Sequence, residues 1–358
     1  MNVIGLDVGG ANLKACDADG NAHSVNFPMW QQPEQLPDAL SKLLAQFPSA
    51  DLIALTMTGE LADCFATKAD GVTAIIDATV HAAGKVPVRV WLTSGEFAEA
   101  DDARELTSLV AAANWHALAT WAALAVPDGP ALLLDMGSTT TDLIPLLDGR
   151  PVPVGLTDVE RLASSELIYT GAGRTPICSL LSSVTLDDHT YGIAAEFFAT
   201  MADAWVYLGR LPETADNCDT ANGRPLTRTF SANRLAHLLC CDHTEVADEF
   251  LQQLAEAAIA EQQHRLSAAA TKVEAQLQAL LEQQQRTLEL EPPTLVVSGS
   301  GGRLVSDAVA DALKWSPKSV LDMASISQPS VAAAACAFAV ARLAQDRCAD
   351  DLLECSPF

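Results

Sequence analysis

Three glycine-containing turns, each directly after a short apolar run, are the segments of this sequence best suited to chemistry. At such a turn the backbone N–H groups point outward, and the missing side chains let the oxygens of a phosphate approach closely. A chain can bind a phosphorylated small molecule in this way with little help from lysine or arginine. The candidate phosphate-binding residues are Gly9, Gly10, Ala11, Asn12 and Lys14 at the first turn, Gly137, Ser138, Thr139 and Thr140 at the second, and Gly299, Ser300, Gly301 and Gly302 at the third.

An aspartate ends the apolar run before each of the first two turns. If Asp7 and Asp135 face one another across a cleft, their carboxylates repel unless a divalent cation lies between them. Mg²⁺ that also binds phosphate oxygens is the natural occupant. The alternative is that both aspartates only cap their turns. Lys14 is expected to meet a phosphate as a point charge, or else to be an exposed strand residue.

Glu60 follows a further apolar run, residues 52–57, and the dipeptide Thr58-Gly59. A carboxylate there could accept the proton of a hydroxyl nucleophile, which makes Glu60 a candidate catalytic residue beside the two aspartates. The alternative is an acidic residue that begins a helix, where the helix dipole favours it. The candidate substrate contacts are Thr58, Gly59, Arg161, Tyr169 and Arg174.

The elements that must position these residues form a pattern that occurs twice. Residues 3–8 and 131–136 are apolar strands that lead into Asp-x-Gly turns, and each continues through its turn into a second strand. This repeat predicts two related domains. We further expect helices over about 33–47, through 60–84, in two stretches that reach about 125, and over 330–343, with strands at 52–57 and 88–92. Residues 244–286 are expected to form an amphipathic pair of helices rather than a coiled coil.

The net charge limits the partners of the protein. With 21 Lys and Arg against 46 Asp and Glu, the 358-residue chain carries a charge of −25 at pH 7. Nucleic acids and anionic membranes are bound through clustered basic side chains, which the sequence lacks, so neither is an expected partner. The nine scattered cysteines form no Cys-x-x-Cys motif, and no signal peptide is evident, so we expect a cytoplasmic protein with reduced thiols. A homodimer is left open.

In the order of its three turns the chain resembles the actin-like ATPase superfamily, which includes sugar kinases, acetate kinase, Hsp70 and actin. Residues 5–14 are similar to the first phosphate loop of that superfamily, residues 133–142 to the second, and residues 296–302 to the adenosine loop. The resemblance implies an α/β fold of two ribonuclease-H-like domains with a cleft between them. One would comprise residues 1–127, completed by the C-terminal helix 330–345, and the other residues 128–329 with a helical insertion.

Within that superfamily the chain is most similar to the hydantoinase A/oxoprolinase group. Residues 56–63, 113–115, 169–171 and 174–176 are similar to its branch of tetrahydromethanopterin-linked C1-transfer proteins, which includes methanofuran biosynthesis. The resemblance implies a Mg²⁺-dependent transferase that joins a furanmethanol diphosphate to γ-glutamyltyramine and releases pyrophosphate. Gly10-Ala11 and Ser300 depart from the kinase loops, which favours a diphosphate substrate over ATP. The alternatives are an ATP-dependent kinase or cyclic-amide hydrolase, and a nucleotide-sensing protein without turnover.

Overall fold

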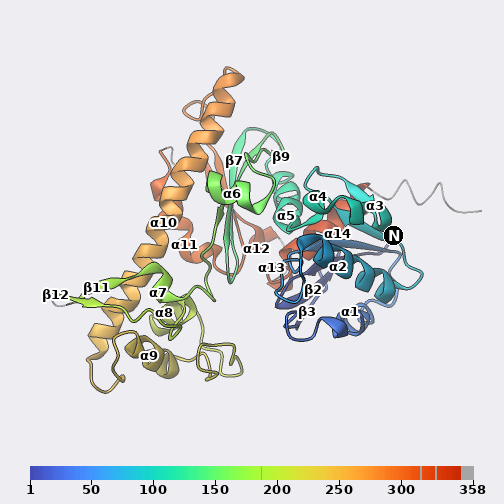
Figure 1. Ribbon diagram of the computed structural model, residues 1–358. Helices are drawn as coiled ribbons and strands as arrows, with labels where there is room; N and C mark the ends of the chain where they lie inside the picture. Colours follow the sequence, from blue (N-terminus) through green and yellow to red (C-terminus); the bar gives the residue numbers. More distant parts are fainter. Residues whose placement is uncertain (187, 315–316, 327–328, 348–358) are drawn as a thin grey trace, which may run out of the picture.

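The computed structural model describes residues 1–186, 188–314, 317–326 and 329–347. Two large mixed sheets occupy different halves of the molecule, one built from the N-terminal part of the chain and the other from the middle and later parts (Figure 1). Each sheet has its own buried apolar core, which it forms with the helices that cover it. No described helix combines the length and the apolar surface that crossing a bilayer requires.

The strands of the first sheet are β1 (Val3–Val8), β2 (Asn12–Asp17), β3 (Ala22–Asn26), β4 (Leu52–Met57), β5 (Val88–Trp91) and β6 (Phe97–Glu99). Their order is β3-β2-β1-β4-β5-β6. The first three strands are antiparallel neighbours, whereas β4 runs parallel to β1 and β5 parallel to β4. The strand β6 was not expected from the sequence; it is three residues long and pairs antiparallel with β5.

The second sheet repeats this arrangement. It contains β7 (Pro130–Met136), β8 (Thr141–Leu147), β9 (Arg150–Pro151), β10 (Leu167–Ile168), β13 (Thr294–Ser298) and β14 (Ser319–Asp322). The strand β7 pairs antiparallel with β8 and parallel with β13, as β1 does with β2 and β4. The predicted α/β fold of two ribonuclease-H-like units is therefore confirmed, whereas the boundary between residues 127 and 128 stays a prediction.

The helices around the first sheet come from both ends of the chain. They are the 3₁₀ turn η1 (Pro33–Gln35), α1 (Leu36–Leu44), α2 (Lys68–Ala83), α3 (Ala100–Glu105), α4 (Thr107–Val110), α5 (Asn114–Ala123) and α14 (Ala335–Arg347). The C-terminal helix α14 packs on β1, β2, β4 and α5. Its backbone approaches β1 so closely that a Cβ atom on Gly5 would lie 1.9 Å from the carbonyl oxygen of Ala337. Only glycine fits at that strand position.

The helices of the second half include one of 36 residues. They are α6 (Asp158–Ser164), α7 (Ile177–Leu180), α8 (Met201–Tyr207), α9 (Arg228–His237), α10 (Asp248–Gln283), α11 (Gly302–Ala312) and α12 (Met323–Ile326), with a small hairpin of β11 (Ser183–Leu186) and β12 (His189–Gly192). The short helix α13 (Pro329–Ala332) follows α12 in the chain but also packs on β3 and α14 of the first half. The predicted pair of helices within 244–286 is wrong, because α10 is a single rod that packs on α8, α9 and α11 (Figure 1). No glycine or proline interrupts it, and buried apolar residues recur along its length from Leu251 to Leu281.

Two other helix predictions need correction. The helix α2 begins at Lys68, not near residue 60, because Thr67 caps it by accepting a hydrogen bond from the backbone N–H of Asp70. Residues 60–67 form turns instead, so Glu60 does not begin a helix. The expected helix over 330–343 is divided into α13 and α14.

Candidate active site

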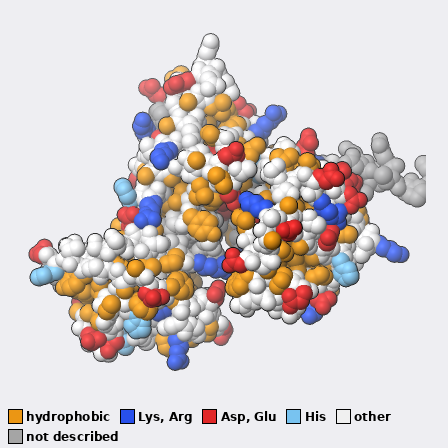
Figure 2. Space-filling model, viewed as in Figure 1, with side chains coloured by type: hydrophobic (Ala, Val, Ile, Leu, Met, Phe, Trp, Pro, Cys, Tyr) orange, Lys and Arg blue, Asp and Glu red, His pale blue; other side chains and the backbone are white. Residues whose placement is uncertain are grey.

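A cleft of about 540 Å³ lies between the two halves, where the β1–β2 and β7–β8 hairpins face each other. On the surface it is a hollow with charged side chains on its borders (Figure 2). Most of the predicted site residues line it. The lining residues from that prediction are Asp7, Gly9, Gly10, Ala11, Asn12, Lys14, Thr58, Glu60, Asp135, Gly137, Ser138, Thr139, Thr140, Arg161, Tyr169 and Arg174.

The first turn connects β1 to β2 and points its tip into the cleft. The backbone N–H of Gly9 donates to the carbonyl oxygen of Asn12 at 3.0 Å, which closes the turn. Behind it, the N–H groups of Phe27 and Met29 donate to Ala11 and Gly10. A Cβ atom on Gly10 would meet nothing within 4 Å, so the space beside this residue is open to a ligand.

The second turn, between β7 and β8, has the same construction. The N–H of Gly137 donates to the carbonyl oxygen of Thr140 at 2.9 Å. A neighbouring segment supports the turn from behind, since the N–H groups of Gly173 and Arg174 donate to the carbonyl oxygen of Ser138. Gly171 lies in that segment, and a Cβ atom on it would lie 2.5 Å from the backbone nitrogen of Thr139. The two turns therefore present equivalent backbone surfaces to one cavity.

Asp7 reaches the cleft from the end of β1. It is only 5% exposed, and its Oδ1 atom has no hydrogen-bond partner among the described residues. The Nζ atom of Lys14, opposite Asp7 in the hairpin, lies 3.9 Å from Oδ2. Burial raises the pKa of Asp7, and the charge of Lys14 opposes that shift.

Asp135 has the equivalent place at the end of β7. Burial and, after it, the neighbouring carboxylate of Asp142 raise its pKa to about 7, while a hydrogen bond with Ser298 and the charge of Lys14 act the other way. Asp7 also contributes to the increase, which indicates that the two aspartates share one electrostatic environment. Two carboxyl groups with raised pKa values in one cleft are typical of a functional site, where they can bind a cation or a proton.

Asp7 and Asp135 fit a magnesium ion whose other ligands are water molecules and the phosphate oxygens of a substrate. Mg²⁺ is usually held by one or two carboxylates, water molecules and substrate phosphates. Asp7 and Asp135 supply the carboxylates, and the Oδ1 atom of Asp7 is an orphaned buried acceptor. Among the residues that the structure describes, no three His, Cys, Asp or Glu side chains form a group that could hold a metal ion by themselves.

The third turn and Gly59 lie behind the cleft. Gly301 donates its N–H to the carbonyl oxygen of Met136 at 2.9 Å, and Gly299, with φ +78°, has no room for a side chain beside that same carbonyl. Neither these residues nor Ser300 and Gly302 line the cavity. Gly59 likewise packs under the first turn, where its N–H donates to Val8. Their predicted contacts with a ligand stay predictions.

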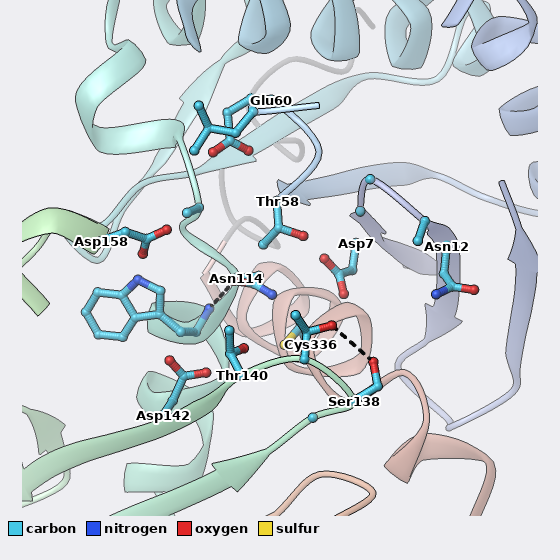
Figure 3. A pocket seen from close by; sticks show the side chains of 18 of the residues that line it. Asp7, Asn12, Thr58, Glu60, Asn114, Ser138, Thr140, Asp142, Asp158 and Cys336 are labelled. Atoms are coloured by element: carbon cyan, nitrogen blue, oxygen red, sulfur yellow. Dashed lines mark hydrogen bonds between the residues drawn. The ribbon is translucent and has the colours of Figure 1, made fainter. Parts of the chain in front are cut away.

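Glu60 lies on the opposite side of the cavity from Asn12 and Ser138 (Figure 3). Its side chain is almost completely buried, at 1% exposure, and Oε2 accepts no hydrogen bond from the described residues. Burial raises the pKa of Glu60, which makes the carboxylate a better proton acceptor.

Arg161 is in the cleft, but its guanidinium is already occupied. It forms ion pairs with Asp142 and Asp158 and lies 4.0 Å from the centre of the Trp115 ring. A direct contact with a substrate anion, as predicted for this residue, would compete with those bonds. Arg174 and Tyr169 are freer: the Nε atom of Arg174 lies 3.7 Å from Asp219 at a half-exposed site, and Tyr169 is 71% exposed.

Several lining residues were not on the predicted list. They include Trp30, Asn114, Trp115, Asp142, Asp158 and Cys336. Asn114, Trp115 and Asp142 carried a signal, since residues 113–115 and 133–142 belong to the segments on which the resemblance rests. Cys336 lies in the first turn of α14, and its pKa is raised well above the usual value, mainly by burial and then by the nearby aspartates. Neither Asp158 nor Cys336 belongs to a motif, so only the fold places them here.

Residues 51–346 match the hydantoinase/oxoprolinase family, and the chain belongs to that family. A stretch of 252 residues is 36% identical to the (4-{4-[2-(gamma-L-glutamylamino)ethyl]phenoxymethyl}furan-2-yl)methanamine synthase of Methanocaldococcus jannaschii. This alignment covers 70% of this chain and 74% of the relative. A protein of the same name from Methanococcus vannielii is 38% identical over 123 residues, or 34% of this chain and 55% of that one.

Among solved structures, the nucleotide-free acetone carboxylase from a study of ATP-dependent acetone carboxylation has a similar fold. The TM-score is 0.51 with 12% sequence identity, and the match covers 95% of this chain and 70% of the carboxylase chain. At this identity the likeness concerns the fold alone.

Proposed function

We propose that the cleft catalyses the formation of an aryl furanylmethyl ether, with a furanmethanol diphosphate as donor and γ-glutamyltyramine as acceptor. The observation that carries the proposal is the 36% identity, over 70% of the chain, to a synthase whose name describes this ether. The phenol oxygen forms a bond to the furanylmethyl carbon, and the bond from that carbon to the diphosphate oxygen breaks. Its electron pair leaves with pyrophosphate.

The two facing turns would hold the diphosphate. The open space at Gly10 and the equivalent turn at Gly137 support this role, because backbone N–H groups bind phosphate oxygens without an excess of basic side chains. Lys14 adds one positive charge. Asp7 and Asp135 would hold Mg²⁺, which when bound neutralises negative charge on the leaving group.

Glu60 would accept the proton that the phenol loses. Its buried, unpartnered oxygen and raised pKa suit a general base. Arg174, half-exposed at the border of the cleft, would contact the carboxylate of the γ-glutamyl group, and Tyr169 and Thr58 the rest of the acceptor. Arg161 would act as a positioning residue through Asp142 and Asp158.

ATP is the alternative ligand of the two turns, because actin-like enzymes use such turns for nucleotides. In that case the protein would be a small-molecule kinase or an ATP-dependent cyclic-amide hydrolase, or it would bind nucleotide without turnover. The third turn, expected to contact adenosine, does not line the cavity, which favours the diphosphate substrate.

The test is an incubation of the purified chain with Mg²⁺, the furanmethanol diphosphate and γ-glutamyltyramine, with and without ATP. We expect the ether by mass spectrometry without ATP, and a Glu60→Gln variant should lose most of the rate. Hydrolysis of ATP with no ether would replace this proposal with the kinase or hydrolase. If ATP binds but is not converted, and no ether forms, the result would favour a nucleotide-sensing protein without turnover.

A further inference from the structure

The cleft has two sides of different chemistry. Figure 3 shows Asn12 and Ser138, from the two turns, on one side, and Glu60 and Asp158 on the other, with Asp142 beside Thr140 of the second turn. We refer to Glu60, Asp142 and Asp158 together as the acidic lobe. The proposed displacement uses Glu60 as its base, and Asp142 lies next to the second turn, opposite Asp135. It gives the carboxylate of Asp158 no contact with the diphosphate or the phenol, so the acidic lobe needs an explanation of its own.

Arg161 balances only part of the charge of the acidic lobe. Its Nη1 atom donates to Oδ1 of Asp158 at 3.0 Å, and Nη2 donates to Oδ1 of Asp142. The arginine is 1% exposed and stacks on Trp115, so it holds the two aspartates in place. The positive charge of Lys68 also acts on Glu60. With Glu60 ionised, three carboxylates face Arg161 and Lys68, and the lobe keeps an excess of one negative charge.

Glu60 provides independent evidence for a missing positive group. Its Oε2 atom is buried and has no donor among the described residues, although a buried carboxylate oxygen without a hydrogen bond is costly. Besides burial, the charge of Lys68 lowers the pKa of Glu60 and the charge of Asp158 raises it, which indicates that Glu60 and Asp158 interact within the lobe. A cation with several N–H donors would satisfy them together.

The surroundings favour an organic ammonium over a metal ion. The carboxylates are not grouped as a set of three that could hold a metal within the described chain. Apolar residues lie beside this charged group: Leu167 is opposite Asp142 in the β8–β10 ladder, and Trp115 lies against Arg161. Both line the cavity. A primary ammonium on a flat ring presents this mixture of charge and apolar surface.

We propose that the acidic lobe binds the primary ammonium of the aminomethyl group on the furan substrate, with Asp158 and Glu60 as its carboxylate partners. This inference rests on the proposed function, whose product is a furanyl methanamine. The substrate would then span the cleft, with its diphosphate at the two turns and its ammonium at the acidic lobe. An ammonium beside Glu60 would also favour the ionised carboxylate, which is the form that accepts a proton.

The test uses furfurylamine and its neutral counterpart furfuryl alcohol as probes, so that binding is measured without turnover. By ligand-observed NMR titration we expect the wild type to bind the amine at least about tenfold more tightly than the alcohol, as for a hydrogen-bonded charge. In Asp158→Asn the preference should fall to about twofold or less. Asparagine keeps an oxygen that can accept from Arg161, so the change removes charge with little loss of packing.

Glu256→Gln is the matched control, because it removes one negative charge from an exposed site on α10 outside the cleft. It should keep the wild-type preference. Equal binding of both probes by the wild type, no saturable binding of the amine, or an unchanged preference in Asp158→Asn would each overturn the ammonium site. If one of these results is found but the ether still forms in the assay of the proposed function, only the ammonium site is contradicted and the proposed function is retained. If the preference for furfurylamine depends on Asp158 but no ether forms, the ammonium site is supported and the proposed function is contradicted.

Discussion

Asp142 lies directly opposite Asp135 in the β7–β8 ladder, at the position that Lys14 takes opposite Asp7 in the β1–β2 ladder. The two hairpins have the same strand pairing, but the residue opposite the aspartate is positively charged in the first and negatively charged in the second. In the first, a lysine accompanies the buried aspartate. In the second, a further carboxylate does, and the pKa of Asp135 rises to about 7.

Removal of the Asp142 charge should lower the pKa of Asp135. In Asp142→Asn the repulsion between the paired residues is lost, so Asp135 should ionise at lower pH than in the wild type. Carboxyl ¹³C NMR titration measures this directly. Glu256→Gln should leave the titration unchanged, and an unaltered Asp135 in Asp142→Asn would contradict the electrostatic role of this pair.

The stability of the fold should depend on pH through Asp135. Its folded-state pKa of about 7 is above the ordinary value of 3.8, so between these pH values the folded protein holds a proton that the unfolded chain lacks. The stability from this proton is complete below about pH 3.8 and is lost as pH rises through about 7. The difference in Tm between Asp135→Asn and the wild type should therefore grow in favour of the variant from pH 5 to pH 8. A constant difference would contradict the raised pKa.

Asp7→Asn should separate function from stability. Burial disfavours the charged form of Asp7, so the neutral amide should keep or raise Tm at pH 7. The same change removes a carboxylate proposed to hold Mg²⁺, and we expect ether formation to fall by at least about 100-fold. Thermal denaturation and the mass-spectrometric assay measure the two effects. A fall in Tm with full activity would contradict both expectations.

The glycines of the first hairpin should respond differently to alanine. Gly5→Ala would drive a Cβ into the backbone of α14 and should destabilise the protein by at least about 2 kcal/mol, measured by chemical denaturation. Gly10→Ala meets no protein atom within 4 Å and should leave the stability unchanged. If the turn cradles a diphosphate, Gly10→Ala should weaken pyrophosphate binding in the presence of Mg²⁺. Unchanged binding would contradict that role.

Arg161→Met should be strongly destabilising, because it leaves Asp142 and Asp158 without their buried partner. We expect a loss of about 3–5 kcal/mol in chemical denaturation. Arg265 pairs with Glu261 at a partly exposed site, so Arg265→Met should cost about 1 kcal/mol or less. Similar losses for both variants would show that the Arg161 cluster has no special structural role.

The parts of the site that are continuous in sequence were predictable. Asp7 with the first turn, and Asp135 with the second, occupy short segments in which the strand, the acid and the glycines follow one another. The repeat of that unit also predicted the paired sheets. The order of residues along the chain was enough to predict these parts, because the two strands of a hairpin fix the position of the turn that joins them.

The rest of the site depends on contacts between distant elements. Asp158 and Cys336 reach the cleft from α6 and α14, and no local pattern marks them. Arg161 was predicted to contact substrate, but the fold pairs it with Asp142, 19 residues away. In the third turn, Gly299 and Gly301 pack closely against Met136, while the contact of this turn with a ligand stays a prediction. Tertiary packing decides such cases, and it cannot be deduced from spacing along the chain.

The proposed displacement is tested most directly with γ-glutamyltyramine whose phenol oxygen is ¹⁸O, incubated with the furanmethanol diphosphate, Mg²⁺ and the purified wild type, and followed by mass spectrometry. The proposal predicts one ¹⁸O atom in every ether molecule, unlabelled pyrophosphate, and equal amounts of the two products. An ether without the label, labelled pyrophosphate, or the absence of ether would contradict it.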